Sequence, residues 1–130
     1  MRVVLDTNVI VSALLVPQSV PGRVLNLLLT GDLTIVYDNS LLIEYIEVLQ
    51  REKFKINKEL AVYITDFIKM EGQFAVSNPQ KIRFTDPSDR KFYEVFKTCE
   101  ADYLITGNKK HFPMDRGIVT PREFLEKEYL

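Results

Sequence analysis

The strongest constraint on this chain of 130 residues is a repeated alternation of short apolar runs with helical patterns. Apolar runs without polar alternation are typical of strands buried on both faces of a sheet. Parallel strands need long connections, which helices usually supply, so the order predicts a doubly wound α/β fold with a parallel sheet covered on both faces. We expect strands at 2–5, 33–37, 74–76, 103–106 and 118–119, and helices at 9–15, 24–29, 41–51 and 57–70, with two more opening at 86–89 and 120–123.

Two of these helices carry an apolar stripe. Leu60, Ile64, Phe67 and Ile68 share one face, which we expect in the core or at an interface. Cys99 lies on the apolar face of the helix that opens at 86–89, so we expect it to pack, and a lone cysteine forms no internal disulfide or thiolate zinc site. Aromatic residues on such stripes are expected in the core before they stack on bases: Tyr45, Phe67, Phe92 and Phe96.

Composition and charge limit the class of protein. With 46% hydrophobic and 27% charged residues and no linker-like tract or repeat, we expect a single domain over 1–130. A net charge of −1 excludes bulk electrostatic binding of polyanions, so a polyanion needs a local basic patch or a metal ion. The apolar run before Asp6 is too short for a signal peptide or a membrane span, so we expect a cytoplasmic location without membrane association.

Polar residues follow several of the expected strands. Asp6 follows the first strand, Asp38 the second, and Asn108 the strand at 103–106. In an open parallel sheet, ligands bind beyond the carboxyl ends of the strands. Asp38 is followed by Asn39-Ser40, which favours helix capping instead. Asp6 and Asn108 are therefore predicted to meet at one edge of the sheet.

Two further acidic residues are predicted to face the same edge. Glu44 lies between Leu41 and Val48 at the border of a buried helical stripe, and Leu41 cannot act as its capping partner. Asp89 stands three residues before Phe92, at the start of a helix. Taken alone, Asp89 suits a helix start equally well, because acidic residues there are favoured by the helix dipole.

Crowded carboxylates repel one another unless a cation stands among them. Oxygen ligands without a nearby histidine or cysteine suit Mg²⁺ or Mn²⁺. Such an ion activates a water molecule and neutralises the charge that develops on a phosphodiester. The pattern therefore indicates metal-dependent nuclease chemistry.

At these residues the sequence resembles the PIN-domain family, in particular the VapC-like toxin components of prokaryotic toxin–antitoxin systems. The resemblance spans essentially the whole chain and is carried by four segments: Val3–Val9, Glu44 within 42–45, Asp86–Asp89 and Ala101–Asn108. It implies a three-layer α/β/α sandwich and an RNA-cleaving site that binds Mg²⁺ or Mn²⁺. It also implies a homodimer restrained by a small antitoxin protein.

The resemblance assigns roles to particular residues. Asp6, Glu44 and Asp89 match the acids that bind metal and carry catalysis, and Thr7 and Asn8 match residues that orient them. A fourth family acid is replaced by Asn108, a neutral oxygen donor that we expect to place water or phosphate. Asp86 stands one turn before Asp89 and is expected to act mainly as a helix cap.

Basic residues near these acids are candidates for binding RNA, although such clusters are usually solvated surface. The candidates are Arg51, Lys53, Lys109 and Lys110. For His111 we favour a solvated loop over a phosphate contact, and for Asp102 a structural hydrogen bond.

Two alternatives to a ribonuclease remain at this point. The first is a decayed PIN-like module that binds RNA or protein without catalysis, which Asn108 favours. The second is an aspartyl-phosphate enzyme, which is weaker because Asn8 stands where the haloacid-dehalogenase pattern needs an aspartate. A receiver domain needs a late-strand lysine, where Thr106-Gly107 stands.

Overall fold

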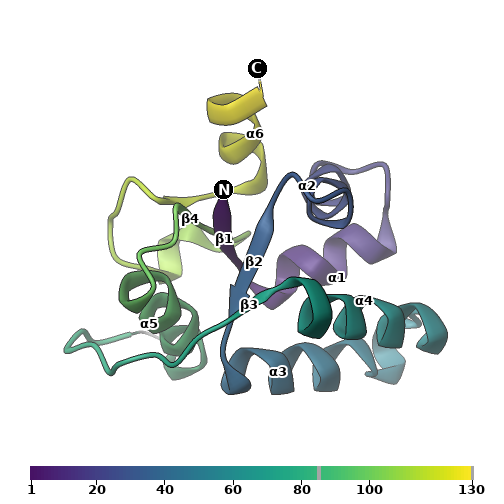
Figure 1. Ribbon diagram of the computed structural model, residues 1–130, viewed down its shortest axis with the longest axis horizontal. Helices are drawn as coiled ribbons and strands as arrows, with labels where there is room; N and C mark the ends of the chain where they lie inside the picture. The colour runs from purple at the N-terminus through teal and green to yellow at the C-terminus, as the bar shows by residue number, and fades with distance from the viewer. Residues whose placement is uncertain (85, 130) are drawn as a thin grey trace.

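Five parallel strands form the centre of the computed structural model, which describes residues 1–84 and 86–129 (Figure 1). Their order across the sheet is β3-β2-β1-β4-β5. The first strand along the chain is thus the central one, and chain-distant segments flank it. The strands are β1 (Arg2–Leu5), β2 (Thr34–Tyr37), β3 (Gln73–Phe74), β4 (Tyr103–Ile105) and β5 (Ile118–Val119).

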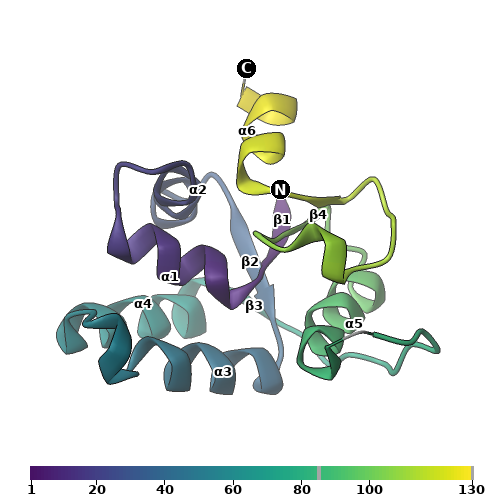
Figure 2. The ribbon, with the colours of Figure 1, turned by 180° about the vertical axis from the view of Figure 1, so that it is seen from behind.

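Helices cover this sheet on both sides. In two opposite views, α1 to α4 lie on one side of the strands and α5 on the other, while α6 contacts α2 and β5 (Figures 1 and 2). The α/β fold with a parallel sheet flanked by helices is therefore confirmed. The helices are α1 (Thr7–Leu15), α2 (Val20–Leu29), α3 (Asn39–Leu49), α4 (Lys58–Glu71), α5 (Arg90–Thr98) and α6 (Pro121–Tyr129), with short 3-10 turns η1 (Glu52–Phe54), η2 (Pro87–Asp89) and η3 (Lys109–His111).

The pairing register fixes which residues follow the strands at the same edge. Val3 pairs with Ile35 in β2 and with Tyr103 in β4. The backbone N–H of Asp6 donates to the carbonyl of Ile105 at 3.0 Å, which extends the pairing one residue beyond β1. The first residues after β1 and β4 are therefore neighbours.

Capping residues explain where some helices begin. Ser19 accepts a hydrogen bond from the N–H of Gly22 at 3.2 Å, so α2 begins at Val20, earlier than the predicted 24–29. Asp38 accepts from the N–H of Leu41 at 2.9 Å, which starts α3 at Asn39. The capping role predicted for Asp38 is thus confirmed.

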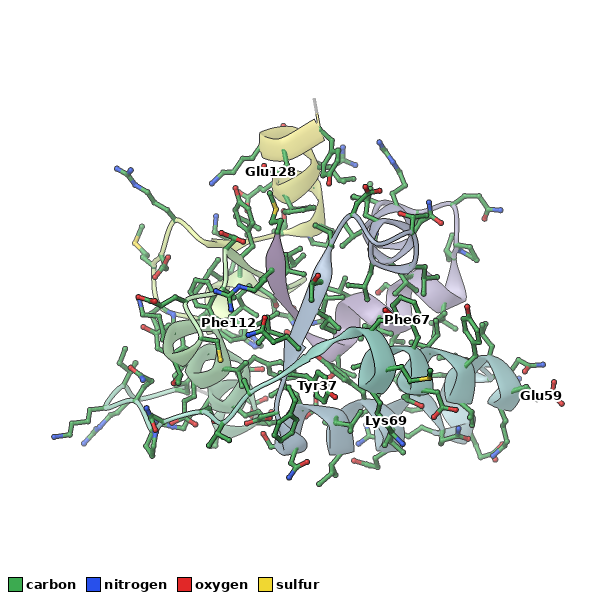
Figure 3. All side chains as sticks on the ribbon, in the orientation of Figure 1. Tyr37, Glu59, Phe67, Lys69, Phe112 and Glu128 are labelled. Atoms are coloured by element: carbon green, nitrogen blue, oxygen red, sulfur yellow. The ribbon has the colours of Figure 1, made fainter. Side chains whose placement is uncertain are left out.

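The buried face of α4 differs from the predicted stripe at one position. Leu60 is 40% exposed, whereas Ala61, Ile64 and Ile68 are buried against α3 and β2. Leu60 therefore lies outside the core, because the helix turns Ala61 inward in its first turn, and its predicted place at an interface stays a prediction. At the far end of α4, the Tyr37 hydroxyl donates to the carbonyl of Lys69 at 3.3 Å and ties the helix to β2 (Figure 3).

The core confirms most of the predicted packing. Tyr45, Phe92 and Phe96 are buried. Phe67 and Cys99 are half-buried and pack against the hydrophobic core. Within the described residues no single helix has the length and apolarity to cross a membrane; α1 and α2 pass such a test only as a pair bent by 102°.

Candidate metal centre

Asp6 lies between the end of β1 and the start of α1, in the middle of the sheet edge. It is 6% exposed, and its Oδ2 accepts a hydrogen bond from the Thr106 hydroxyl at 2.7 Å. Burial raises the pKa of Asp6 to about 6, the Thr106 hydrogen bond opposes the rise, and the carboxylates of Asp89 and Glu44 add to it. The backbone N–H of Asn8 at the start of α1 also lowers the pKa of Asp6, but its geometry falls short of a capping hydrogen bond, so capping explains the place of Asp6 only in part.

Glu44 approaches the same edge from α3. One carboxylate oxygen accepts a hydrogen bond from the Thr7 hydroxyl, and the other lies 2.7 Å from the Lys91 ammonium. Next to it, the buried Tyr45 hydroxyl donates to the carbonyl of Leu5 at 2.5 Å. Burial and nearby carboxylates raise the pKa of Tyr45 well above its usual value, which keeps this donor protonated. The Tyr45 hydrogen bond thus fixes α3 to the end of β1.

Asp86 and Asp89 have different roles at the start of α5. Asp86 accepts hydrogen bonds from the N–H and the hydroxyl of Ser88 at 3.0 and 2.8 Å, and these bonds lower its pKa. Asp89 makes no capping hydrogen bond, and its Oδ2 lies 3.2 Å from Nδ1 of His111. Burial and the Asp86 carboxylate raise the pKa of Asp89. Capping therefore falls to Asp86 and leaves the Asp89 carboxylate facing His111.

One cavity of about 500 Å³ collects these groups. Its walls include all the acids and orienting residues that the sequence singles out: Asp6, Glu44, Asp86, Asp89, Thr7, Asn8 and Asn108. Asn8 accepts a hydrogen bond from the N–H of Gly107 at 3.3 Å, and the N–H of Asn108 donates to the Thr106 hydroxyl at 3.0 Å. The residues that follow β1 and β4 are therefore tied together around Asp6.

Comparison with known families assigns the chain to a family. The sequence profile of the PIN domain matches residues 2–110, which include the acids and orienting residues of the cavity and end one residue before His111. The chain belongs to the PIN domain family. PIN domains are a family of nucleases that typically bind divalent metal ions. Comparisons with curated proteins and with solved structures gave no match.

The donor chemistry of this PIN domain fits a hard divalent cation, because carboxylate and amide oxygens are the ligands such ions prefer. Asp6, which is 6% exposed, lies directly at the carboxyl end of β1. As placed in residues 1–84 and 86–129, no three Asp, Glu, His or Cys side chains lie close enough to share an ion. Glu44 pairs with Lys91, and Asp89 lies beside His111. Binding of one metal ion by all three acids therefore requires the side chains of Glu44 and Asp89 to rotate.

Three side-chain contacts of the site were not predicted from the sequence. His111 was expected in a solvated loop, and its side chain is indeed 45% exposed in the turn η3, but it also lines the cavity and lies beside Asp89. Thr106 was treated only as part of a strand, although it holds Asp6. Lys91 gave no signal, because a lysine near the start of an amphipathic helix normally faces solvent.

The remaining polar residues have structural partners or lie at the surface. Asp102 accepts a hydrogen bond from the backbone N–H of Arg2 at 2.8 Å, which confirms its predicted structural role. Lys109 lies 3.1 Å from the Glu123 carboxylate and Arg51 lies 2.8 Å from that of Glu47, both near the surface. Lys53 lies over the ring of Phe54, and Lys110 is exposed. Their predicted contact with RNA stays a prediction.

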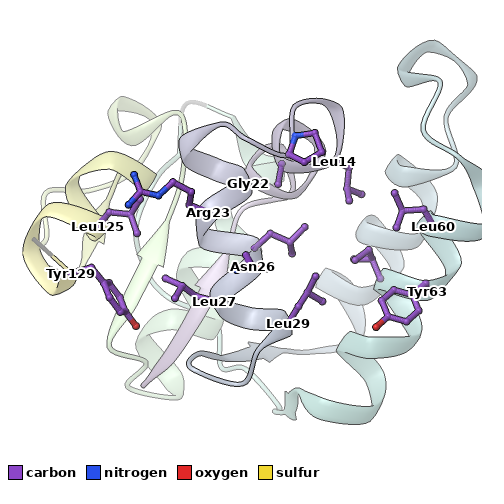
Figure 4. Close-up of a pocket in the computed structure, with 14 residues that line it drawn as sticks. Leu14, Gly22, Arg23, Asn26, Leu27, Leu29, Leu60, Tyr63, Leu125 and Tyr129 are labelled. Carbon is purple, nitrogen blue, oxygen red and sulfur yellow. The ribbon is translucent and has the colours of Figure 1, made fainter.

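A second cavity, of about 520 Å³, lies around α2 (Figure 4). Leu60 and Tyr63 reach it from α4, and Leu125 and Tyr129 from α6. Among the described residues that line it, none is an Asp, Glu, His or Cys. Its volume matches that of the acidic cavity, but it offers neither carboxylates nor other metal ligands of these types, so we place the nuclease chemistry at the strand ends.

Proposed function

We propose that this PIN domain is a Mg²⁺- or Mn²⁺-dependent ribonuclease that hydrolyses phosphodiester bonds. The observation that carries the proposal is the buried Asp6 carboxylate at the central strand end, with Glu44 and Asp89 on the same cavity. Burying a carboxylate among other carboxylates is costly, and a divalent cation removes that cost. A site whose buried carboxylates are stabilised by a bound cation is suited to metal-assisted hydrolysis.

In this proposal Asp6, Glu44 and Asp89 hold the ion and carry catalysis. When bound, the ion supplies a water of lowered pKa and neutralises charge on the phosphodiester. Thr106 holds one oxygen of Asp6, and Thr7 holds one oxygen of Glu44. Asn8 fixes the turn after β4, and Asn108 offers its amide to water or phosphate at the wall of the cavity. Asp86 supports Asp89 by starting the helix.

RNA as the substrate is supported by cations on two sides of the cavity. Lys109 and Lys110 line a neighbouring hollow of about 360 Å³ that shares Asn108 and His111 with the acidic cavity. On another side Phe54 lines the acidic cavity, and Lys53 lies beside it in η1, with Arg51 just before. A single strand that crosses an acidic pocket needs such groups for its phosphates.

The proposed biological role is that of a VapC-like toxin acting in the cytoplasm as a homodimer restrained by a small antitoxin. It rests on the resemblance of the motifs around Asp6, Glu44, Asp89 and Asn108. Co-expression with the neighbouring reading frame, followed by size-exclusion chromatography with light scattering, tests both the partner and the dimer. A monomer that neither binds that product nor slows growth when expressed alone would contradict this role.

A binding module without catalysis is the second candidate. It is favoured by Asn108 in place of an acid, and by the ammonium of Lys91 and the ring of His111 against two of the acids. Calorimetric titration with Mn²⁺ separates the two candidates. Absence of binding at millimolar Mn²⁺, together with RNA binding that leaves the strand intact, would favour the module.

The cleavage assay tests the enzyme directly. We expect labelled single-stranded RNA to be cut in Mn²⁺ or Mg²⁺ and left intact in EDTA. Glu44→Gln is expected to lower the rate by about tenfold or more, because even residues that only orient metal ligands cost that much when lost. Glu47→Gln on the same helix is the matched control, since Glu47 pairs with Arg51 at the surface. Equal rates for both variants would remove Glu44 from the mechanism.

A further inference from the structure

Lys91 is held beside the acidic cavity by three contacts. Its ammonium lies 2.7 Å from Oε1 of Glu44, 2.8 Å from the carbonyl of Ser88, and 5.3 Å from the centre of the Phe92 ring. The side chains of Lys91 and Glu44 are 24% and 23% exposed, so water screens this pair only partly. Lys91 is therefore fixed in place, unlike most surface lysines.

Glu44 has both carboxylate oxygens engaged in this arrangement. The Thr7 hydroxyl donates to Oε2, and Lys91 pairs with Oε1. Thr7 is a neutral donor, so its hydrogen bond is compatible with a cation on the same carboxylate. An ammonium and a divalent cation on one carboxylate repel each other strongly at such distances. Binding of a metal ion by Glu44 therefore largely excludes the ion pair between Glu44 and Lys91.

The charge of Lys91 also reaches the other acids of the site. Coulombic attraction from Lys91 acts on Asp86 and Asp89 as well as on Glu44. Without a cation, these groups and Asp6 would repel one another across a cavity of about 500 Å³. One lysine at this position offsets part of that repulsion.

We propose that Lys91 is the internal counter-ion of this cavity: it positions Glu44 and competes with the divalent cation for that carboxylate. The inference rests on the proposed function, because the competitor is the metal ion of the nuclease. Lys91 then sets the affinity for metal and keeps the acids assembled when metal is scarce. It is a positioning residue, since it acts on the substrate only through Glu44.

Removing the charge of Lys91 is expected to tighten metal binding. In calorimetric titrations, Lys91→Met should lower the Kd for Mn²⁺ by about fivefold, the effect of removing one partly exposed ion pair. Lys91→Arg keeps the cation and should restore the wild-type Kd. Lys97→Met is a matched control from the same helix, because Lys97 pairs with Asp115 at 3.2 Å and lies over the Phe96 ring. Lys97→Met should leave the Kd unchanged.

Thermal melting in EDTA measures the counter-ion role without metal. Lys91→Met should lower the Tm by about 4 °C more than Lys97→Met, because Glu44 loses its only cationic partner among the described residues. Added Mn²⁺ should close this gap. Equal Kd and equal Tm for the two variants would overturn the proposal. If the wild-type protein gives no Mn²⁺ binding heat, the proposed nuclease function fails, while the melting comparison in EDTA still decides whether Lys91 serves Glu44.

Discussion

Asp6→Asn is expected to lower metal-dependent RNA cleavage by more than about 100-fold, since the loss of a residue that only orients a metal ligand already costs about 10- to 100-fold. Asparagine keeps the size of the side chain and an oxygen that accepts from Thr106. It removes the negative charge that holds a divalent cation. The fold should therefore persist while the chemistry is lost, as measured by the single-turnover cleavage rate in Mn²⁺.

The same substitution is expected to stabilise the fold at neutral and alkaline pH. Burial raises the pKa of Asp6 from 3.8 to about 6, so the folded protein binds more protons than the unfolded chain between these values. Stability is therefore lost as the pH rises through this window, by up to about 3 kcal/mol above the folded pKa. An asparagine at this position carries no such cost, and the variant should exceed the wild type in EDTA at about pH 8 and match it near pH 3.

Urea denaturation at the two pH values gives the measurement, and Asp32→Asn is the matched control. Asp32 lies exposed in the turn before β2, and its carboxylate accepts a hydrogen bond from the Thr30 hydroxyl at 2.9 Å. Its replacement should change the free energy of unfolding by less than about 0.5 kcal/mol at either pH. If Asp6→Asn keeps full activity, Asp6 has no part in the mechanism. If it destabilises the fold at alkaline pH, the Asp6 carboxylate stabilises the fold there instead of straining it.

Local patterns were sufficient to predict the sheet and the edge at which the candidate acids gather. The strands are apolar apart from the first residues of β1, β2 and β3, and the polar residue directly after β1 marks the point where the chain leaves the sheet. Both properties are set by a few neighbouring residues. Glu44 was predictable for a similar reason, because its place between Leu41 and Val48 on a helix decides which way it points.

Contacts between distant segments could not be predicted in this way. Lys91 in α5 meets Glu44 in α3, and His111 meets Asp89 across the whole of α5 and β4. Nothing in the composition of either segment distinguishes these residues from surface residues. Asp86 and Asp89 offered the same capping chemistry, and only the single 3-10 turn between them decides that Asp86 caps and Asp89 faces the cavity.

Phe124→Ala is expected to lower the free energy of unfolding by about 3–5 kcal/mol, the usual cost of truncating a buried phenylalanine. Phe124 is fully buried in α6, outside the segment that the PIN domain profile matches. Its ring packs edge to face on Tyr103 in β4 at 5.2 Å, and against Tyr129 at 6.0 Å. A cavity at this point would loosen α6 from the sheet.

The effect of this substitution decides whether residues 111–130 belong to the same folding unit as the acidic site. β5 pairs with β4 beside the turn that carries Asn108, so a loss at Phe124 should appear as one cooperative transition in urea. Tyr63→Ala is the control: Tyr63 is 59% exposed on α4, and its loss should cost less than about 1 kcal/mol. A two-step transition for Phe124→Ala, with α6 melting first and RNA cleavage retained, would place α6 outside the unit that positions Asp6. A single transition that takes the cleavage activity with it would mean that the edge of the sheet needs α6 to hold β4 and β5 in register.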